Sequence, residues 1–136
     1  MVLENASLKE IQEFFSQDKF AVKACGAQII SAERGHAVCE TTLDSIHMNA
    51  MNEVMGGAIF TLADFALAIA CNIGEAPTVL VSANIEYLSV ARGKKLIAEC
   101  TTDKSGRSLG FYTIMVRDEL GGMVAKMQAT CARKAE

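Results

Sequence analysis

The chain has 136 residues and a mass of 14.6 kDa, so we expect residues 1–136 to form a single domain around one core. Apolar residues make up 51% and charged residues 21%, which excludes an intrinsically disordered chain. Thirteen Lys and Arg residues stand against 16 Asp and Glu, without a basic block, which argues against a nucleic-acid-binding surface. The longest apolar stretch, 56–71, is shorter than the ~20 residues of a membrane span, so we expect no membrane partner.

The cysteines and histidines also restrict the class of protein. The five cysteines are scattered, odd in number and without a C-x-x-C pair: Cys25, Cys39, Cys71, Cys100 and Cys131. This usage predicts reduced, mostly buried thiols and, with no secretory signal pattern after Met1, a cytoplasmic protein. The chain has two histidines, no H-x-x-x-H motif and no glycine-rich nucleotide loop. We therefore expect neither a catalytic metal nor a cofactor.

The first elements in chain order are a short helix and a strand region. Ser7 followed by Glu10 is typical of a capping box, which predicts a helix over 8–17 within an N-terminal segment, 1–18. The next region, 20–43, predicts one or two strands broken at Arg34-Gly35. The segment 58–71 is rich in Ala and Leu and apolar nearly all round, which predicts a buried helix.

The second half of the chain predicts antiparallel strands. Alternating or apolar runs cover 79–88, 95–102, 109–117 and 123–131, and short turns at 103–106 and 118–122 connect the last three. The fold class is therefore α+β: an antiparallel sheet wrapped around one long central helix, the hotdog arrangement. A sheet this small leaves its edges open, and pairing with a second copy would close one of them. We expect a homodimer at least.

Asp64 is the anomaly of the central helix. A carboxylate among apolar residues needs a partner, a raised pKa or a cavity, because burying an unpaired charge costs several kcal/mol. The alternative is a charge on a solvated stripe or across an interface. Since the helix offers no polar stripe, the pattern favours a functional carboxylate.

The glycines Gly56 and Gly57 begin this helix. Glycine allows close approach to the backbone, and the first amides of a helix suit an oxyanion, although a flexible turn would have the same sequence. Asp64 lies eight residues beyond Gly56, roughly 12 Å along a helix axis. One substrate carbonyl cannot reach both within one chain. A site that uses both therefore needs Asp64 from one subunit and the Gly56 amide from another.

Two polar residues precede the glycines. Asn49 can hold a water or a carbonyl through its amide, although an Asn in a loop more commonly caps its own turn. His47 is a candidate base, but no Ser or Cys is spaced to form a triad with it.

The run from His47-Met48-Asn49 through Gly56-Gly57 to Asp64 resembles the signature of the PaaI-like hotdog thioesterases. The resemblance extends over about 20–134. It implies hydrolysis of an acyl-CoA thioester, with Asp64 as nucleophile or general base, the Gly56 amide polarising the carbonyl and Asn49 orienting water or substrate. It also implies coenzyme A bound along the interface of a dimer or a dimer of dimers, without a metal or a cofactor.

One position departs from the family pattern, because Met55 stands where the family usually has His before the two glycines. Met cannot donate a hydrogen bond or take a proton, so a lower rate or a different acyl preference is expected. We expect His47, Met55 and Gly57 to contact substrate. Further candidates for the acyl pocket are Met51, Phe60 and Phe65, and for the coenzyme A phosphates Lys94, Lys95 and Arg107.

The leading hypothesis is therefore acyl-CoA thioester hydrolysis. Two alternatives remain open. One is a non-catalytic domain that binds acyl-CoA, which the absence of the histidine favours. The other is an enoyl-CoA hydratase-type activity, which would require His47 to reach Asp64.

Overall fold

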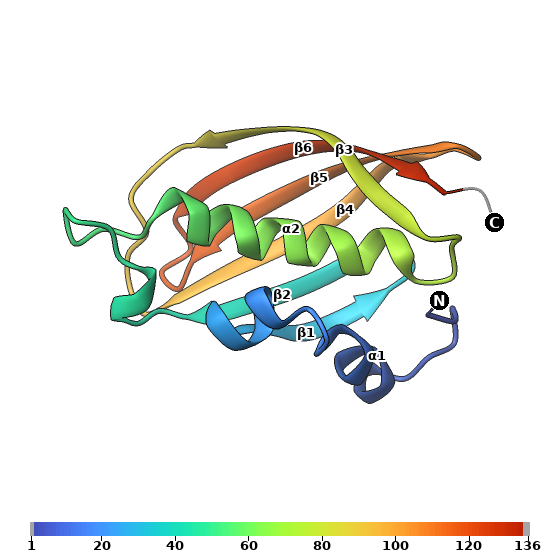
Figure 1. The fold of residues 1–136 in the computed structure, drawn as a ribbon. Coiled ribbons are helices and arrows are strands. Elements are labelled where there is room, and N and C mark those ends of the chain that lie inside the picture. Colours follow the sequence, from blue (N-terminus) through green and yellow to red (C-terminus); the bar gives the residue numbers. More distant parts are fainter. Residues whose placement is uncertain (1, 135–136) are drawn as a thin grey trace.

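The computed structural model describes residues 2–134. The elements, in chain order, are helix α1 (Leu8–Phe15), the π-helical turn η1 (Phe20–Ala24), β1 (Ala27–Glu33), β2 (His36–Thr42), the 3₁₀ turn η2 (Ser45–His47), helix α2 (Gly56–Asn72), β3 (Thr78–Tyr87), β4 (Lys95–Ser105), β5 (Leu109–Asp118) and β6 (Met123–Arg133). The six strands form one antiparallel sheet in the order β1-β2-β4-β5-β6-β3. The sheet curves around α2 (Figure 1), which confirms the predicted hotdog fold.

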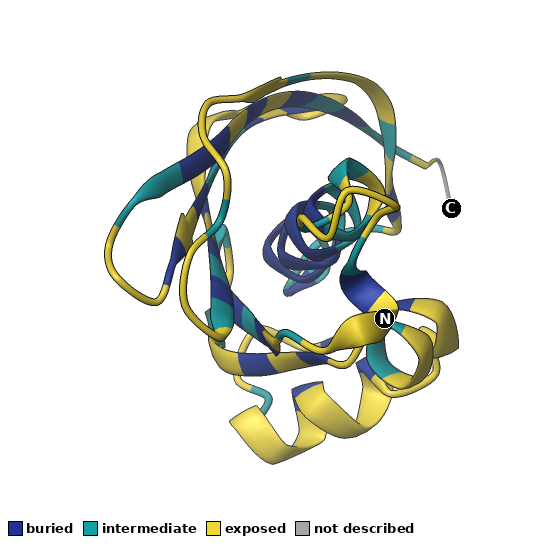
Figure 2. Cartoon of the chain, turned by 90° about the vertical axis from the view of Figure 1, so that its left-hand side faces the viewer, coloured by how far each residue is buried: buried dark blue, intermediate teal, exposed yellow. Residues whose placement is uncertain are grey.

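Helix α2 packs its apolar side into the concave face of the sheet (Figure 2). Its buried residues form the centre of the core together with inward-facing residues of β2, β4, β5 and β6. The expectation of burial all round was wrong for one face. Residues at helical spacing along this face are partly or fully accessible: Gly57, Phe60, Thr61, Asp64 and Ala68. This accessible stripe of α2 positions the candidate site.

The strand region after α1 begins later than predicted. Residues 20–24 form η1, in which the Cys25 N–H donates to the Phe20 carbonyl at 2.9 Å, and Ala21 is buried in the core. The chain reverses into β1 at Gly26, whose φ of +74° suits glycine. The predicted break is confirmed, since Gly35 adopts a φ of +79° between β1 and β2.

Two details of the later strands also differ. The turn predicted at 103–106 lies further on, because a bulge near Asp103 extends β4 to Ser105 and the Thr113 hydroxyl donates to the Asp103 carboxylate at 2.7 Å. A second bulge, between Leu80 and Ser82, interrupts the simple alternation of β3. Most of β3, which lies at the edge of the sheet, is accessible, although it carries apolar residues.

Helix α1 begins with the predicted capping box. The Glu10 carboxylate accepts from the Ser7 N–H at 2.9 Å, and the Ser7 hydroxyl accepts from the Glu10 N–H at 3.2 Å. The Gln12 side chain donates to the Ile29 carbonyl of β1 at 2.9 Å, and Phe15 packs edge-on against Phe65 of α2. These contacts fix α1 beside β1 and bring the segment that follows it toward α2.

Four of the five free cysteines are buried, as predicted, and Cys25 is half-buried. Burial raises the pKa of the Cys39 thiol to about 12. Within residues 2–134, no helix is both long and apolar enough to cross a membrane.

Candidate active site

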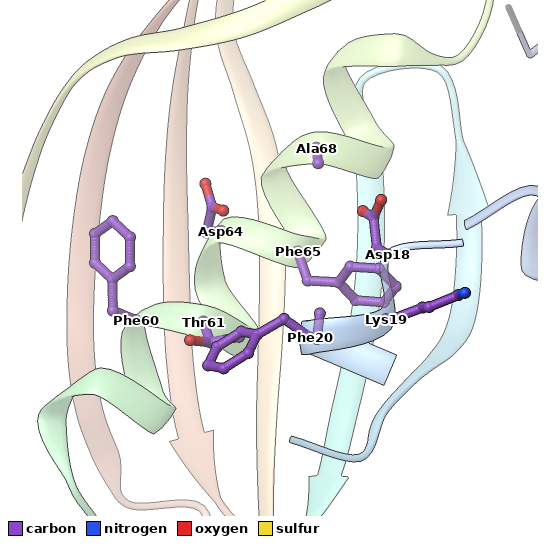
Figure 3. Close-up of a pocket in the computed structure, with 9 residues that line it drawn as sticks. Asp18, Lys19, Phe20, Phe60, Thr61, Asp64, Phe65 and Ala68 are labelled. Carbon is purple, nitrogen blue, oxygen red and sulfur yellow. The ribbon is translucent and has the colours of Figure 1, made fainter. Parts of the chain in front are cut away.

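Asp64 lies on the accessible stripe of α2 and faces a cavity of about 420 Å³ (Figure 3). One wall of the cavity comes from α2 and the other from residues 18–21, which lead into η1 and form its first turn. The lining residues are Asp18, Lys19, Phe20, Ala21, Phe60, Thr61, Asp64, Phe65 and Ala68. The predicted anomaly is thus a half-buried carboxylate at a cavity rather than a charge sealed in the core.

The electrostatics of this cavity raise the affinity of Asp64 for a proton. Partial burial raises the pKa of Asp64, and the negative charge of Asp18 raises it further. Asp18 lies at the rim, and desolvation raises its pKa as well. Lys19 directs its ammonium group away from Asp64 (Figure 3). Sequence reasoning missed Asp18, because tertiary packing, including that of Phe15 on Phe65 and of Ala21 in the core, brings its segment to α2.

A second cavity, of about 600 Å³, lies beside the beginning of α2. Its lining is largely apolar: Phe20, Ala24, Cys25, Ile46, His47, Met55, Gly57, Ala58, Phe60, Thr61 and Tyr87. Phe20, Phe60 and Thr61 line both cavities. The two therefore form one groove along the helix, which we call the α2 groove.

Helix α2 begins without a side-chain cap. Met55 is the N-cap residue and makes no capping hydrogen bond. Among residues 2–134, the Gly56 and Gly57 N–H groups donate no hydrogen bond. Free amides at a helix N-terminus are suited to negative charge on a ligand oxygen.

A close contact explains why position 56 is glycine. The Tyr87 hydroxyl donates to the Gly56 carbonyl at 3.1 Å, and a Cβ at Gly56 would lie 3.3 Å from Tyr87 Cζ. Gly56 lines a separate cavity of about 320 Å³, which Asp64 does not reach. Within one chain the structure therefore does not bring Gly56 and Asp64 together, in agreement with their spacing along the helix.

His47 lines the α2 groove, but both of its ring nitrogens are engaged. Nδ1 accepts from the Asp44 N–H at 3.0 Å, and Nε2 donates to the Cys25 carbonyl at 2.6 Å. This pattern requires the neutral Nε2–H tautomer, because a carbonyl can only accept. The main-chain oxygen of His47 also accepts from the Met55 N–H at 2.8 Å. His47 thus ties the end of η1 to the start of α2. Within residues 2–134 it lines the larger cavity and Asp64 the smaller one, so one chain does not place the two in the same cavity, as a hydratase would need.

Asn49 holds the loop that precedes α2. Its side-chain oxygen accepts from the N–H groups of Met51 at 2.9 Å and Glu53 at 3.1 Å. It lines neither cavity of the α2 groove within this chain. Asn49 thus caps its own turn, which is the alternative to a catalytic role that the sequence left open.

The cations considered for coenzyme A lie away from the α2 groove. Lys95 pairs with Glu40 at 3.4 Å, while Lys94 and Arg107 are exposed and line neither of its cavities. In the described part of the chain, no group of three His, Cys, Asp or Glu side chains could hold a metal ion.

The fold and a carboxylate facing a groove define a hotdog protein with an enzyme-like site, and comparison with known proteins identifies its family. The thioesterase superfamily model matches residues 51–125, which is more than half of the chain and includes all of α2. The chain therefore belongs to the thioesterase superfamily.

Individual relatives support this assignment. The chain is 33% identical over 104 residues to the acyl-coenzyme A thioesterase PaaI of Escherichia coli, covering 76% of this chain and 74% of PaaI. It is 28% identical over 120 residues to human acyl-coenzyme A thioesterase 13, covering 85% and 86% of the two chains.

Two solved structures show the same arrangement of elements. The E. coli PaaI structure has a TM-score of 0.82 and 27% identity, covering 95% of this chain and 97% of PaaI. The smu.793 protein of Streptococcus mutans, solved bound to acetyl CoA, has a TM-score of 0.73 and 25% identity, covering 79% and 91%.

Proposed function

We propose that this protein is an acyl-CoA thioesterase, which hydrolyses an acyl-CoA thioester to the free carboxylic acid and coenzyme A. The observation that carries the proposal is the half-buried Asp64 carboxylate, which faces a largely apolar groove in a chain of the thioesterase superfamily. Relatives named acyl-coenzyme A thioesterase and a neighbour bound to acetyl CoA support the substrate class.

The proposed reaction begins with Asp64 in its ionised form. Its raised pKa makes the carboxylate more basic than an exposed Asp. In one route Asp64 takes a proton from water as the water oxygen bonds to the thioester carbon. In the other the carboxylate oxygen bonds to that carbon, and water then hydrolyses the resulting anhydride. In both routes the carbon–sulfur bond breaks, and sulfur leaves as thiolate and takes up a proton.

The proposed oxyanion donor is the Gly56 N–H of a second copy of the chain. The amide is free among the described residues, and the start of the helix favours a developing negative charge. The structure of one chain separates Gly56 from Asp64, so a shared site requires two chains. We propose that Asn49, His47, Met55 and Gly57 position water or contact substrate in that assembly.

The sheet supports a homodimer. Helix α1 lies against one edge strand, β1, and its Gln12 side chain occupies the Ile29 carbonyl of that strand. The other edge strand, β3, has no strand beyond it among residues 2–134 and exposes Val79 and Val81. Pairing of β3 with its copy would cover both its main-chain groups and these side chains. We propose further that two such dimers assemble into a dimer of dimers.

A cytoplasmic location is also proposed. The five free thiols, four of them buried, suit a reducing compartment. The net charge of −3 gives no support to a nucleic-acid partner.

Free-thiol release from a panel of acyl-CoAs tests the function, with Asp64→Asn as the variant and Glu13→Gln, an exposed carboxylate on α1, as the matched control. We expect turnover with the wild type and Glu13→Gln and a loss of at least about 100-fold in Asp64→Asn. Because partial burial disfavours the charge of Asp64, its neutral replacement should unfold at a temperature no lower than that of the wild type.

The same experiment separates the alternatives. Acyl-CoA binding by calorimetry without thiol release would contradict the proposal and indicate a binding domain. Loss of enoyl absorbance without thiol release would indicate a hydratase.

A further inference from the structure

The segment between α1 and β1 places an aromatic side chain in the α2 groove. Phe20 is the first residue of η1 and is 70% exposed, although a large apolar side chain gains free energy when it is buried. Its ring lies beside Thr61 in Figure 3. Together with Phe60 and Thr61, Phe20 lines both cavities of the groove. It therefore stands where the cavity of Asp64 joins the larger apolar cavity.

Two hydrogen bonds and one buried side chain hold the backbone that carries the Phe20 ring. The Phe20 carbonyl accepts from the Cys25 N–H, the Cys25 carbonyl accepts from His47 Nε2 at 2.6 Å, and Ala21 is buried in the core. Phe20 thus presents an exposed ring from a fixed backbone. A side chain in this situation can restrict what passes it, because the main chain beneath it cannot easily yield.

The charges in the groove restrict the acyl group further. Asp18 and Asp64 face the smaller cavity, and the larger one is lined mostly by apolar side chains. Among the described residues that line the groove, Lys19 is the only cation, and its ammonium group points away from Asp64. An acyl group that ends in a carboxylate would meet the like charges of Asp18 and Asp64 in the smaller cavity.

We infer that Phe20 determines acyl specificity, by narrowing the α2 groove next to Asp64 so that it selects neutral, apolar acyl groups according to their bulk. The inference rests on the proposed thioester hydrolysis and adds the acyl class and the residue that selects it. Truncating the ring joins the two cavities through a wider opening and admits bulkier groups.

Thiol release from acetyl-, dodecanoyl-, benzoyl- and succinyl-CoA tests this inference with Phe20→Ala. The matched control is Phe14→Ala, because Phe14 is 43% exposed on α1 and lines neither cavity of the groove. We expect Phe20→Ala to raise kcat/KM for the dodecanoyl or benzoyl substrate relative to acetyl by about tenfold. Phe14→Ala should leave the ratio unchanged, and succinyl-CoA should be a poor substrate of every variant.

Several results would overturn the inference. One is a ratio of kcat/KM between the bulky substrates and acetyl-CoA that stays unchanged in Phe20→Ala or changes equally in Phe14→Ala. Another is efficient turnover of succinyl-CoA. A third is a uniform loss of kcat/KM for all substrates in Phe20→Ala, together with dissociation of an oligomer in sedimentation. If the wild type releases no thiol, the proposed hydrolysis itself fails. Calorimetric affinities for non-hydrolysable acyl-CoA thioethers, compared between the same two variants, then decide the role of Phe20.

Discussion

Asp64 shows how far a single residue can be interpreted from sequence. A carboxylate at a central position of an apolar helix was recognisable because of its desolvation cost. The structure places it on the accessible stripe of α2, where the cavity leaves it half-buried. Asp18, the second carboxylate of that cavity, gave no comparable signal. It lies 46 positions earlier in an exposed polar segment, and tertiary packing alone brings it near Asp64.

The charge of Asp18 sets a pH dependence. Since this charge raises the pKa of Asp64, replacing Asp18 by Asn should lower that pKa and move the acid limb of the kcat/KM profile to lower pH. The other charged or titratable groups near Asp64 are Lys19 at the cavity and the Cys131 thiol of β6.

Measurement of kcat/KM against pH checks this expectation, with Glu13→Gln as a control that removes the same charge from exposed α1. An acid limb that stays in place in Asp18→Asn, or that moves equally in Glu13→Gln, would be evidence against the electrostatic role of Asp18.

At the scale of the element, the beginning of α2 combines two glycines with different surroundings. A Cβ at Gly57 would meet only the end of the flexible Met55 side chain, at 3.8 Å, whereas at Gly56 it would lie 3.3 Å from the Tyr87 ring. The sequence indicated that both glycines could approach a ligand. It did not distinguish them, because the contact depends on where β3 ends.

Substitution by Ala should separate the two positions. Gly57→Ala should raise the free energy of unfolding by about 0.5 kcal/mol, because Ala loses less backbone entropy than Gly in a helix. Gly56→Ala should gain less or lose stability, since Tyr87 must move to admit the methyl group. Urea denaturation of both variants measures the difference. An equal gain at the two positions would show that Tyr87 imposes no restriction.

At the scale of the whole molecule, the strand and helix patterns were sufficient to predict the hotdog fold. Local periodicity and short turns specify hairpins, and one long apolar helix needs a sheet to cover it. The bulge in β3 was not predictable from these patterns, because Val79 and Val81 look like buried alternate positions in sequence. The register of β3 on β6 instead leaves them accessible at the edge. The η1 turn was missed for a similar reason, since a five-residue segment with four apolar residues fits strand or helix.

The exposed edge can be tested directly. Val81 is 57% exposed and lies at the bulge of β3, and Ile30 is 45% exposed at the bulge of β1, the opposite edge strand. Val81→Arg should convert the proposed dimer to a monomer, because pairing of the two β3 edges would bury the charged side chain, whereas Ile30→Arg should not. Sedimentation velocity at several concentrations gives the answer. A Val81→Arg protein that remains dimeric would exclude β3 as the dimer edge.

The central claim is that one active site uses Asp64 of one chain and the Gly56 amide of its partner. Asp64→Asn removes the carboxylate. Gly56→Pro removes the amide at the first helical position, where proline is tolerated, and the extended backbone of Met55, with ψ of 136°, suits a residue before proline. Because the proline ring must displace the exposed Tyr87 side chain, the melting temperature and oligomeric state of this variant are first compared with those of the wild type.

The most direct measurement is thiol release by mixed dimers of these two variants, co-expressed with different tags and purified through both. Each variant alone should be inactive. A mixed dimer should recover about half of the wild-type activity, because one of its two sites pairs an intact Asp64 with an intact Gly56. Mixed dimers as inactive as the two single variants would contradict the shared site. In that case each site would use Asp64 and Gly56 of the same chain, and every chain of the mixed dimer carries one inactivating substitution.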